Sequence, residues 1–101
     1  MSRFDIFVNP NRAAQHGLYV DVQSDFVQLS TRLCIPLRRR AALPLIQGAQ
    51  VIIRVSQHDY VLDTPNLLAV PALLLRQQAG RLSSTDQLLA ESCMEFMLRG
   101  Y

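Results

Sequence analysis

Apolar and polar residues alternate most clearly over residues 18–25. Leu18, Val20 and Val22 point to one side of an extended chain, and the more polar residues between them point to the other. This period of two predicts a strand of an antiparallel sheet with one face in water. The apolar run 33–37 follows the polar connector Ser30-Thr31-Arg32, which predicts a hairpin-like return. Pro36 has no N–H for a strand ladder, so we expect it at a strand end or a sheet edge.

Further strands are predicted on both sides of this pair. Residues 3–9 alternate in the same way and stop at the turn 9–11, after which residues 12–17 are interpreted as a mobile loop. The β-branched and aromatic runs 51–55 and 60–62 flank a polar four-residue tip and predict a second hairpin.

Two short segments follow the second hairpin. Residues 64–68 fit a helical turn with Thr64 as its cap and Pro65 at the first helical position. The apolar run 73–75 is interpreted as a buried strand, although periodicity alone does not separate a buried strand from a buried helix.

The clearest helix pattern lies at the end of the sequence. Ser84 and Gln87 have the spacing of a capping box, Glu95 and Arg99 form a favourable i,i+4 pair, and Gly100 stands where a helix terminates. The face predicted to be apolar consists of Leu88, Leu89, Ser92, Cys93, Phe96 and Met97. Within this face we expect Leu89, Phe96 and Met97 to be core or dimer anchors.

Together these elements predict one domain over residues 1–101, of α+β class and rich in β-structure. A chain of this length buries only about two thirds of the surface of its unfolded state. Because 50% of the residues are apolar, we expect part of the apolar surface to be covered in a homodimer.

Charge and targeting signals narrow the class of protein. The net charge is only +2, without any lysine, which does not give the strong field of a non-specific nucleic-acid binder. The N-terminal residues show no signal segment and no apolar run approaches the roughly 18 residues of a membrane span, so we expect a cytoplasmic protein. Cys34 and Cys93 are predicted to be small buried hydrophobic residues in a reducing compartment.

The sequence shows no motif of an enzyme. It has no nucleophile elbow, no phosphate-binding loop and no paired metal ligands. His16 and His58 fall in predicted loops and are interpreted as solvated imidazoles. The three arginines at 38–40 either bind an anionic partner or lie in a solvated loop. The solvated loop is the preferred interpretation. We therefore expect a binding protein without a cofactor.

The strings Val20-Asp21-Val22-Gln23-Ser24-Asp25 and Ile35-Pro36-Leu37 resemble the CcdB family, the toxins of toxin–antitoxin modules directed at DNA gyrase. Weaker points of resemblance are Phe4, Ala69-Val70-Pro71, Leu82-Ser83 and the apolar helix before Gly100. The resemblance implies a homodimer whose subunits have a five-stranded antiparallel sheet, a small three-stranded wing and a C-terminal helix. The predicted hairpin over 51–62 suits the wing.

The resemblance also implies a function by binding. Family members insert the paired C-terminal ends of their dimer between the halves of the gyrase A-subunit dimer and trap gyrase on broken DNA. A CcdA-like antitoxin extracts them, so DNA is reached only through gyrase or the antitoxin. The residues carried over as gyrase contacts are Ser24, Phe26, Val27, Glu95, Leu98, Arg99, Gly100 and Tyr101. Arg99 departs from the plasmid-encoded family member, which has Trp.

Two alternatives stay open. One is an endoribonuclease toxin of the same fold superfamily, which would need His16 or His58 as a base beside Arg12 or Arg54. The other is a non-toxic homologue that keeps only antitoxin binding.

Overall fold

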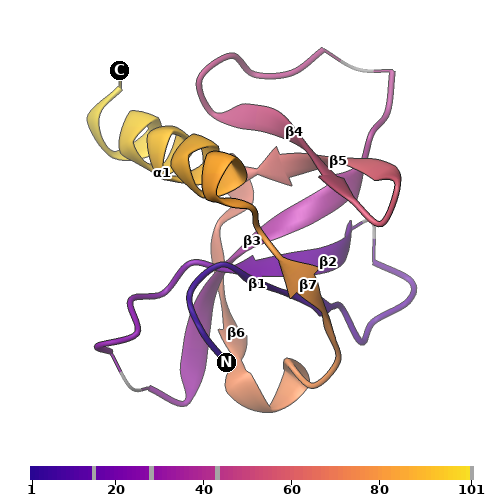
Figure 1. The fold of residues 1–101 in the computed structure, drawn as a ribbon, viewed down its shortest axis with the longest axis vertical. Coiled ribbons are helices and arrows are strands. Elements are labelled where there is room, and N and C mark those ends of the chain that lie inside the picture. Colours follow the sequence, from indigo (N-terminus) through magenta and orange to yellow (C-terminus); the bar gives the residue numbers. More distant parts are fainter. Residues whose placement is uncertain (15, 28, 43, 101) are drawn as a thin grey trace.

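The computed structural model describes residues 1–14, 16–27, 29–42 and 44–100. A curled antiparallel sheet of seven strands carries one helix, α1, against its upper part (Figure 1). The elements are β1 (Asp5–Val8), β2 (His16–Asp21), β3 (Thr31–Arg39), β4 (Gln50–Val55), β5 (His58–Asp63), the 3-10 turn η1 (Thr64–Asn66), β6 (Leu68–Pro71), the 3-10 turn η2 (Ala72–Leu74), β7 (Gln78–Arg81) and α1 (Ser84–Arg99). The predicted α+β class and C-terminal helix are confirmed, but one continuous sheet replaces the expected five strands and three-stranded wing.

The nine-residue strand β3 organises the sheet. The strand order is β4-β5-β3-β2-β1-β7, and β6 adds to β3 outside this path. β3 pairs with β2 on one side, while its other side is shared between β6, opposite residues 31–34, and β5, opposite residues 37–39.

Pro36 lies inside β3 opposite Tyr19, so the prediction that it marks a strand end or sheet edge is wrong. It falls between the stretches that pair with β6 and with β5. A residue without an N–H is tolerated there because neither of those two strands pairs with it.

Strand β2 differs from its prediction in two respects. It begins at His16, so the predicted loop 12–17 is shorter, and β3 begins at Thr31, inside the expected polar connector. The face predicted to be wet is buried, since Tyr19, Asp21 and Gln23 are only 8%, 0% and 9% exposed. The cause is the curl of the sheet, which encloses apolar side chains on both of its faces.

The core accordingly has two parts. The larger cluster lies between the sheet and α1 and includes Ile6, Leu18, Val20, Ile35, Leu37, Ile53, Leu62, Ala90 and Cys93. The smaller cluster consists of Phe7, Tyr19, Cys34, Val70 and Leu75, with Leu68 packed against it. Strands β1 to β3 contribute alternate residues to both clusters, which is why they contain few exposed positions.

The predicted hairpin of β4 and β5 is confirmed, with a two-residue tip in place of four. Ser56 and Gln57 form this tip with φ angles of +49° and +67°, the positive values that match a tight turn to the twist of the flanking strands.

The two segments after the hairpin differ from prediction in detail. The helical turn η1 is present with Pro65 in its first turn, but Asp63 and not Thr64 occupies the cap position. The buried strand expected at 73–75 is wrong, because residues 72–74 form η2 and Leu73 and Leu74 are 77% and 46% exposed. A run of leucines without a period carries no information on which of them face the core.

Helix α1 has the predicted ends, displaced by one residue at the start. Its N-cap is Ser83, whose Oγ accepts a hydrogen bond from the Asp86 N–H at 3.1 Å. At the other end Gly100 takes the left-handed conformation, with a φ of +81°, and its N–H donates to Phe96 O at 2.6 Å.

The buried face of α1 is rotated from the predicted one. Ala90 and Cys93 are buried, whereas Leu89 and Met97 are 38% and 45% exposed and Phe96 is half-buried. Leu89 and Met97 are therefore not anchors of the core within one subunit. The helix lies across β4 and η1, and the small side chains of Ala90 and Cys93 allow a close approach there.

Candidate functional site

The loop between β2 and β3 carries the most exposed large apolar side chain in the described part of the chain. Phe26 is 98% exposed and its neighbour Val27 is 43% exposed, although both are apolar. Ser24 begins the turn that presents them, because its Oγ accepts from the Phe26 N–H at 3.2 Å and its carbonyl accepts from the Val27 N–H at 3.0 Å. The turn thus exposes an aromatic ring to solvent, and two hydrogen bonds of Ser24 hold its backbone.

A buried ion pair lies at the base of this loop. Arg32 Nε contacts Asp21 Oδ2 at 2.8 Å, and the two side chains are 5% and 0% exposed. Arg32 Nη2 also lies 3.6 Å from Asp25 Oδ1. The same oxygen accepts a hydrogen bond from the Arg3 N–H at 2.9 Å. The alternation of residues predicted that Asp21 faces solvent, and it contains no signal for this ion pair. Only the pairing of β2 with β3 brings Asp21 and Arg32 together.

The remaining residues that the family resemblance implies as gyrase contacts lie at the end of α1. Leu98 is 86% exposed, and Glu95 Oε1 lies 3.3 Å from Arg99 Nη1, which confirms the predicted i,i+4 pair. Gly100 follows as the left-handed C-cap. Tyr101 lies outside the described residues. The helix end therefore presents one apolar side chain beside an exposed ion pair.

The loop 44–49 supports this end of α1 through Gly48 and Phe96. Gly48 has a φ of +87°, and a Cβ added there would lie 2.8 Å from the Phe96 ring. Glycine is thus required both by the backbone conformation and by the close approach of the ring.

We expect Gly48→Ala to lower the free energy of unfolding by about 1–3 kcal/mol, because it adds backbone strain and displaces the Phe96 ring. Chemical denaturation measures the loss. Gly17→Ala is the matched control, since a Cβ there meets no atom within 4 Å. Equal stability of Gly48→Ala and the parent would show that the ring moves aside without cost.

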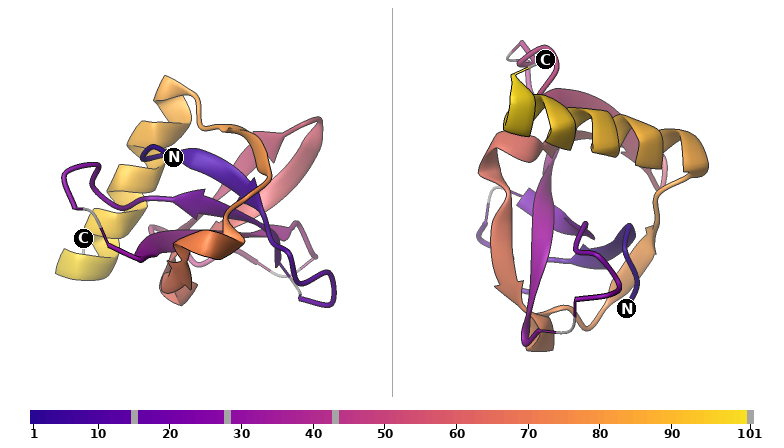
Figure 2. Two further views of the ribbon diagram at one scale, coloured as in Figure 1. Left: turned by 90° about the horizontal axis from the view of Figure 1, so that it is seen from below. Right: turned by 90° about the vertical axis from the view of Figure 1, so that its left-hand side faces the viewer.

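A single copy of the chain does not bring the two predicted groups of contact residues together. The loop between β2 and β3 lies at the lower end of the molecule, and the C-terminal end of α1 lies at the upper end (Figure 1). A view rotated by 90° shows the same separation (Figure 2, right). The seven carried-over positions that the structure describes thus form two surfaces at opposite ends of the molecule.

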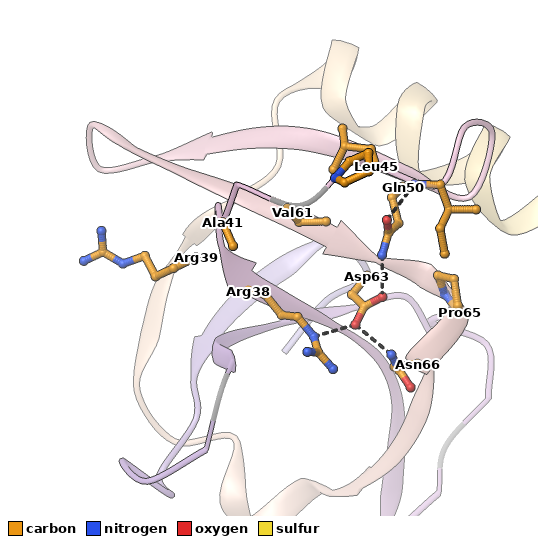
Figure 3. A pocket seen from close by; sticks show the side chains of 11 residues that line it. Arg38, Arg39, Ala41, Leu45, Gln50, Val61, Asp63, Pro65 and Asn66 are labelled. Atoms are coloured by element: carbon orange, nitrogen blue, oxygen red, sulfur yellow. Dashed lines mark hydrogen bonds and ion pairs between the residues drawn. The ribbon is translucent and has the colours of Figure 1, made fainter.

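A pocket of about 550 Å³ lies beside the β4–β5 hairpin and was not predicted from the sequence (Figure 3). On its wall the Asp63 carboxylate accepts from Gln50 Nε2 at 3.0 Å and Asn66 Nδ2 at 2.8 Å, and Arg38 Nε lies 2.6 Å away. The remaining wall includes apolar side chains such as Leu45 and Pro65. The polar groups of Asp63 are thus satisfied within the protein.

The arginine run 38–40 is not the solvated loop that was preferred, because Arg38 and Arg39 belong to β3. Arg39 Nη1 lies 3.0 Å from His58 Nδ1, and its guanidinium lies over the Tyr60 ring at 5.5 Å. Only Arg40 follows the strand.

The nuclease alternative requires a histidine beside Arg12 or Arg54, but both histidines have other neighbours in the structure. His16 is a half-buried residue of β2 whose ring lies against Tyr19, and burial together with the charge of Arg38 lowers its pKa. His58 contacts Arg39, while Arg54 Nη1 lies 3.5 Å from Asp59 Oδ1. The arginine neighbours of the two histidines are thus Arg38 and Arg39, where Arg12 and Arg54 were expected.

The two cysteines are buried as predicted, with exposures of 0% for Cys34 and 2% for Cys93. Burial and the nearby charge of Asp21 raise the pKa of Cys34 to about 12, so its thiol stays protonated. In the described part of the chain, no three His, Cys, Asp or Glu side chains come together as a metal site would require. Among the helices of the same residues, none combines the length and apolar character of a membrane crossing.

Residues 3–100 match the sequence profile of the family described as CcdB protein, which covers nearly the whole chain. No curated protein matches the sequence.

Proposed function

The chain belongs to the CcdB family of toxins from toxin–antitoxin modules, and from this we propose that it binds the A subunit of DNA gyrase and traps gyrase on cleaved DNA. In this proposal the toxin acts by binding alone and breaks no bond itself. A CcdA-like antitoxin neutralises it by binding the same protein. DNA is involved only through gyrase or the antitoxin.

The observation that carries the proposal is the exposed ring of Phe26. An aromatic side chain that is 98% exposed on a hydrogen-bonded turn contributes nothing to the core of its own chain. Aromatic residues, Phe among them, are enriched in the buried core of protein–protein interfaces relative to the rest of the protein surface. Ser24 and Val27 flank it as the rim of the proposed contact.

In a homodimer, both of the separated surfaces could contact the same target. A two-fold axis repeats every surface patch, so a dimer presents two Phe26 loops and two helix ends to a partner that is itself two-fold symmetric. The exposed apolar residues of α1 support such an assembly as surface available for burial. They are Leu88, Leu89 and Met97.

We expect Phe26→Ser to weaken binding to a purified gyrase A-subunit fragment by about tenfold, since an exposed anchor ring is removed without loss of core packing. Titration calorimetry measures the affinity, and growth arrest on expression without antitoxin gives the cellular readout. Leu73→Ser is the matched control, because Leu73 is also apolar, is 77% exposed and lies outside the proposed contact. Absence of gyrase binding by the parent, or unchanged binding by Phe26→Ser, would contradict the proposal.

A further inference from the structure

The side chain of Gln23 joins the tip of the Phe26 loop to the sheet. Its Nε2 donates to Val27 O at 3.0 Å, and its Oε1 accepts from the Leu33 N–H of β3 at 3.0 Å. Gln23 is only 9% exposed, and burial of a primary amide is costly unless its hydrogen bonds are made. The amide therefore fixes the residue next to Phe26 relative to β3.

The backbone of Gln23 is hydrogen-bonded to both members of the buried ion pair. Its N–H donates to Asp21 Oδ1 at 3.0 Å, and its carbonyl accepts from Arg32 Nη2 at 3.4 Å. Gln23 thus lies between the Asp21–Arg32 pair and the loop tip. Any rotation of the tip would have to break bonds to this one residue.

We propose that Gln23 is a positioning residue, which holds the backbone that carries the Phe26 ring in the position used for the partner contact. This inference rests on the proposed gyrase binding. A ring that is 98% exposed would sample many orientations on a mobile loop, and ordering such a loop on binding weakens the affinity. Gln23 removes this cost in the free protein by tying the tip to β3.

A double-mutant cycle tests the proposal. The purified variants Gln23→Ala, Phe26→Ser and the double replacement are titrated with the gyrase A-subunit fragment. We expect Gln23→Ala to weaken binding roughly tenfold in the parent, and to have no further effect once Phe26 is replaced. A general loss of stability would weaken binding by the same factor in both backgrounds.

Asn9 offers a matched control on another loop. It is 5% exposed, its Nδ2 donates to His16 O at 3.0 Å and its Oδ1 accepts from the Asn11 N–H at 3.0 Å. The loop between β1 and β2, which it holds, lies on the other side of the molecule (Figures 1 and 2). We expect Asn9→Ala to leave gyrase affinity unchanged while it removes the same number of amide hydrogen bonds.

Several outcomes would overturn the inference. These are an equal effect of Gln23→Ala with and without Phe26, unchanged affinity of Gln23→Ala, or an equal loss in Asn9→Ala. If Gln23→Ala does not fold, Gln23→Met replaces it, because a thioether of similar length fills the same space and makes neither amide hydrogen bond. The same tenfold weakening is then expected.

Amide hydrogen exchange without any partner separates this inference from the proposed function. The Val27 N–H bonds to Ser24 O, and we expect its exchange to accelerate in Gln23→Ala but not in Asn9→Ala. If the parent fails to bind gyrase, the gyrase proposal is wrong, and the exchange rates still decide whether Gln23 fixes the loop. Unchanged exchange at Val27 would show that it does not.

Discussion

Replacing Asp21 with alanine is expected to lower the free energy of unfolding by about 3–5 kcal/mol. The reason is the burial of its partner, since Arg32 is only 5% exposed and lies 2.8 Å from the Asp21 carboxylate. Without that carboxylate the guanidinium keeps its charge, and Asp25 at 3.6 Å, 56% exposed, is a weaker partner. Chemical denaturation of the purified protein measures the change.

Asp59→Ala provides the control for this prediction. Asp59 pairs with Arg54 at 3.5 Å, but the two side chains are 45% and 68% exposed, so the expected loss is at most about 1 kcal/mol. A second comparison removes both charges of the buried pair, as in Asp21→Leu with Arg32→Met, which should recover much of the lost stability. Equal losses for Asp21→Ala and Asp59→Ala would show that burial of the pair has no energetic consequence.

Replacing Arg99 with tryptophan is expected to strengthen binding to a gyrase whose contact site is lined with arginine. Arg99 pairs with Glu95 at 3.3 Å, but both side chains are more than half exposed, so its positive charge still repels such a site. A Trp ring can instead stack on an arginine, with roughly 0.5–2 kcal/mol per contact. Two copies in a dimer give about 1–4 kcal/mol, which corresponds to roughly 5- to 1,000-fold in affinity.

Arg99→Ala separates relief of repulsion from stacking, because it removes the charge and adds no ring. We expect its affinity to fall between those of the parent and Arg99→Trp, as measured by calorimetry with the same gyrase fragment. A parent that already binds as tightly as Arg99→Trp would show that charge at position 99 has no part in the contact. Tyr101 or the Phe26 loop would then carry the contact.

Local patterns were sufficient for the elements that depend on near neighbours in the chain. Residues 84–100 contain the caps, charges and glycine of a helix, and α1 has those ends to within one residue. The second hairpin was predictable for the same reason, since its two β-branched runs are adjacent in sequence and pair with each other.

The errors concern burial, which depends on residues distant in the chain. The local pattern predicts that Asp21 faces solvent. Strand pairing instead places Arg32 beside it and buries both side chains. Leu89 and Met97 were predicted as core or dimer anchors; they are not core residues, because the direction in which α1 lies on the sheet decides which side of the helix is covered, and the dimer role stays a prediction. Tertiary packing of this kind leaves no signal at a fixed sequence spacing.

The candidate site was predictable in its members and not in its arrangement. The family resemblance selects Phe26 and Leu98, and both are among the most exposed apolar residues described. Nothing in the sequence indicates that the β2–β3 loop and the end of α1 lie at opposite ends of the molecule, because that separation follows from the path of the sheet (Figure 1).

The two buried thiols report on different parts of the molecule. Cys93 belongs to the cluster beneath α1, and Cys34 belongs to the smaller cluster on the other face of the sheet. A buried thiol reacts with an alkylating reagent only while its surroundings are open. The modification rate of Cys93 therefore measures how often the helix lifts from the sheet, and that of Cys34 measures how often the smaller cluster opens. Comparing the two rates in one experiment shows whether these parts open together or separately.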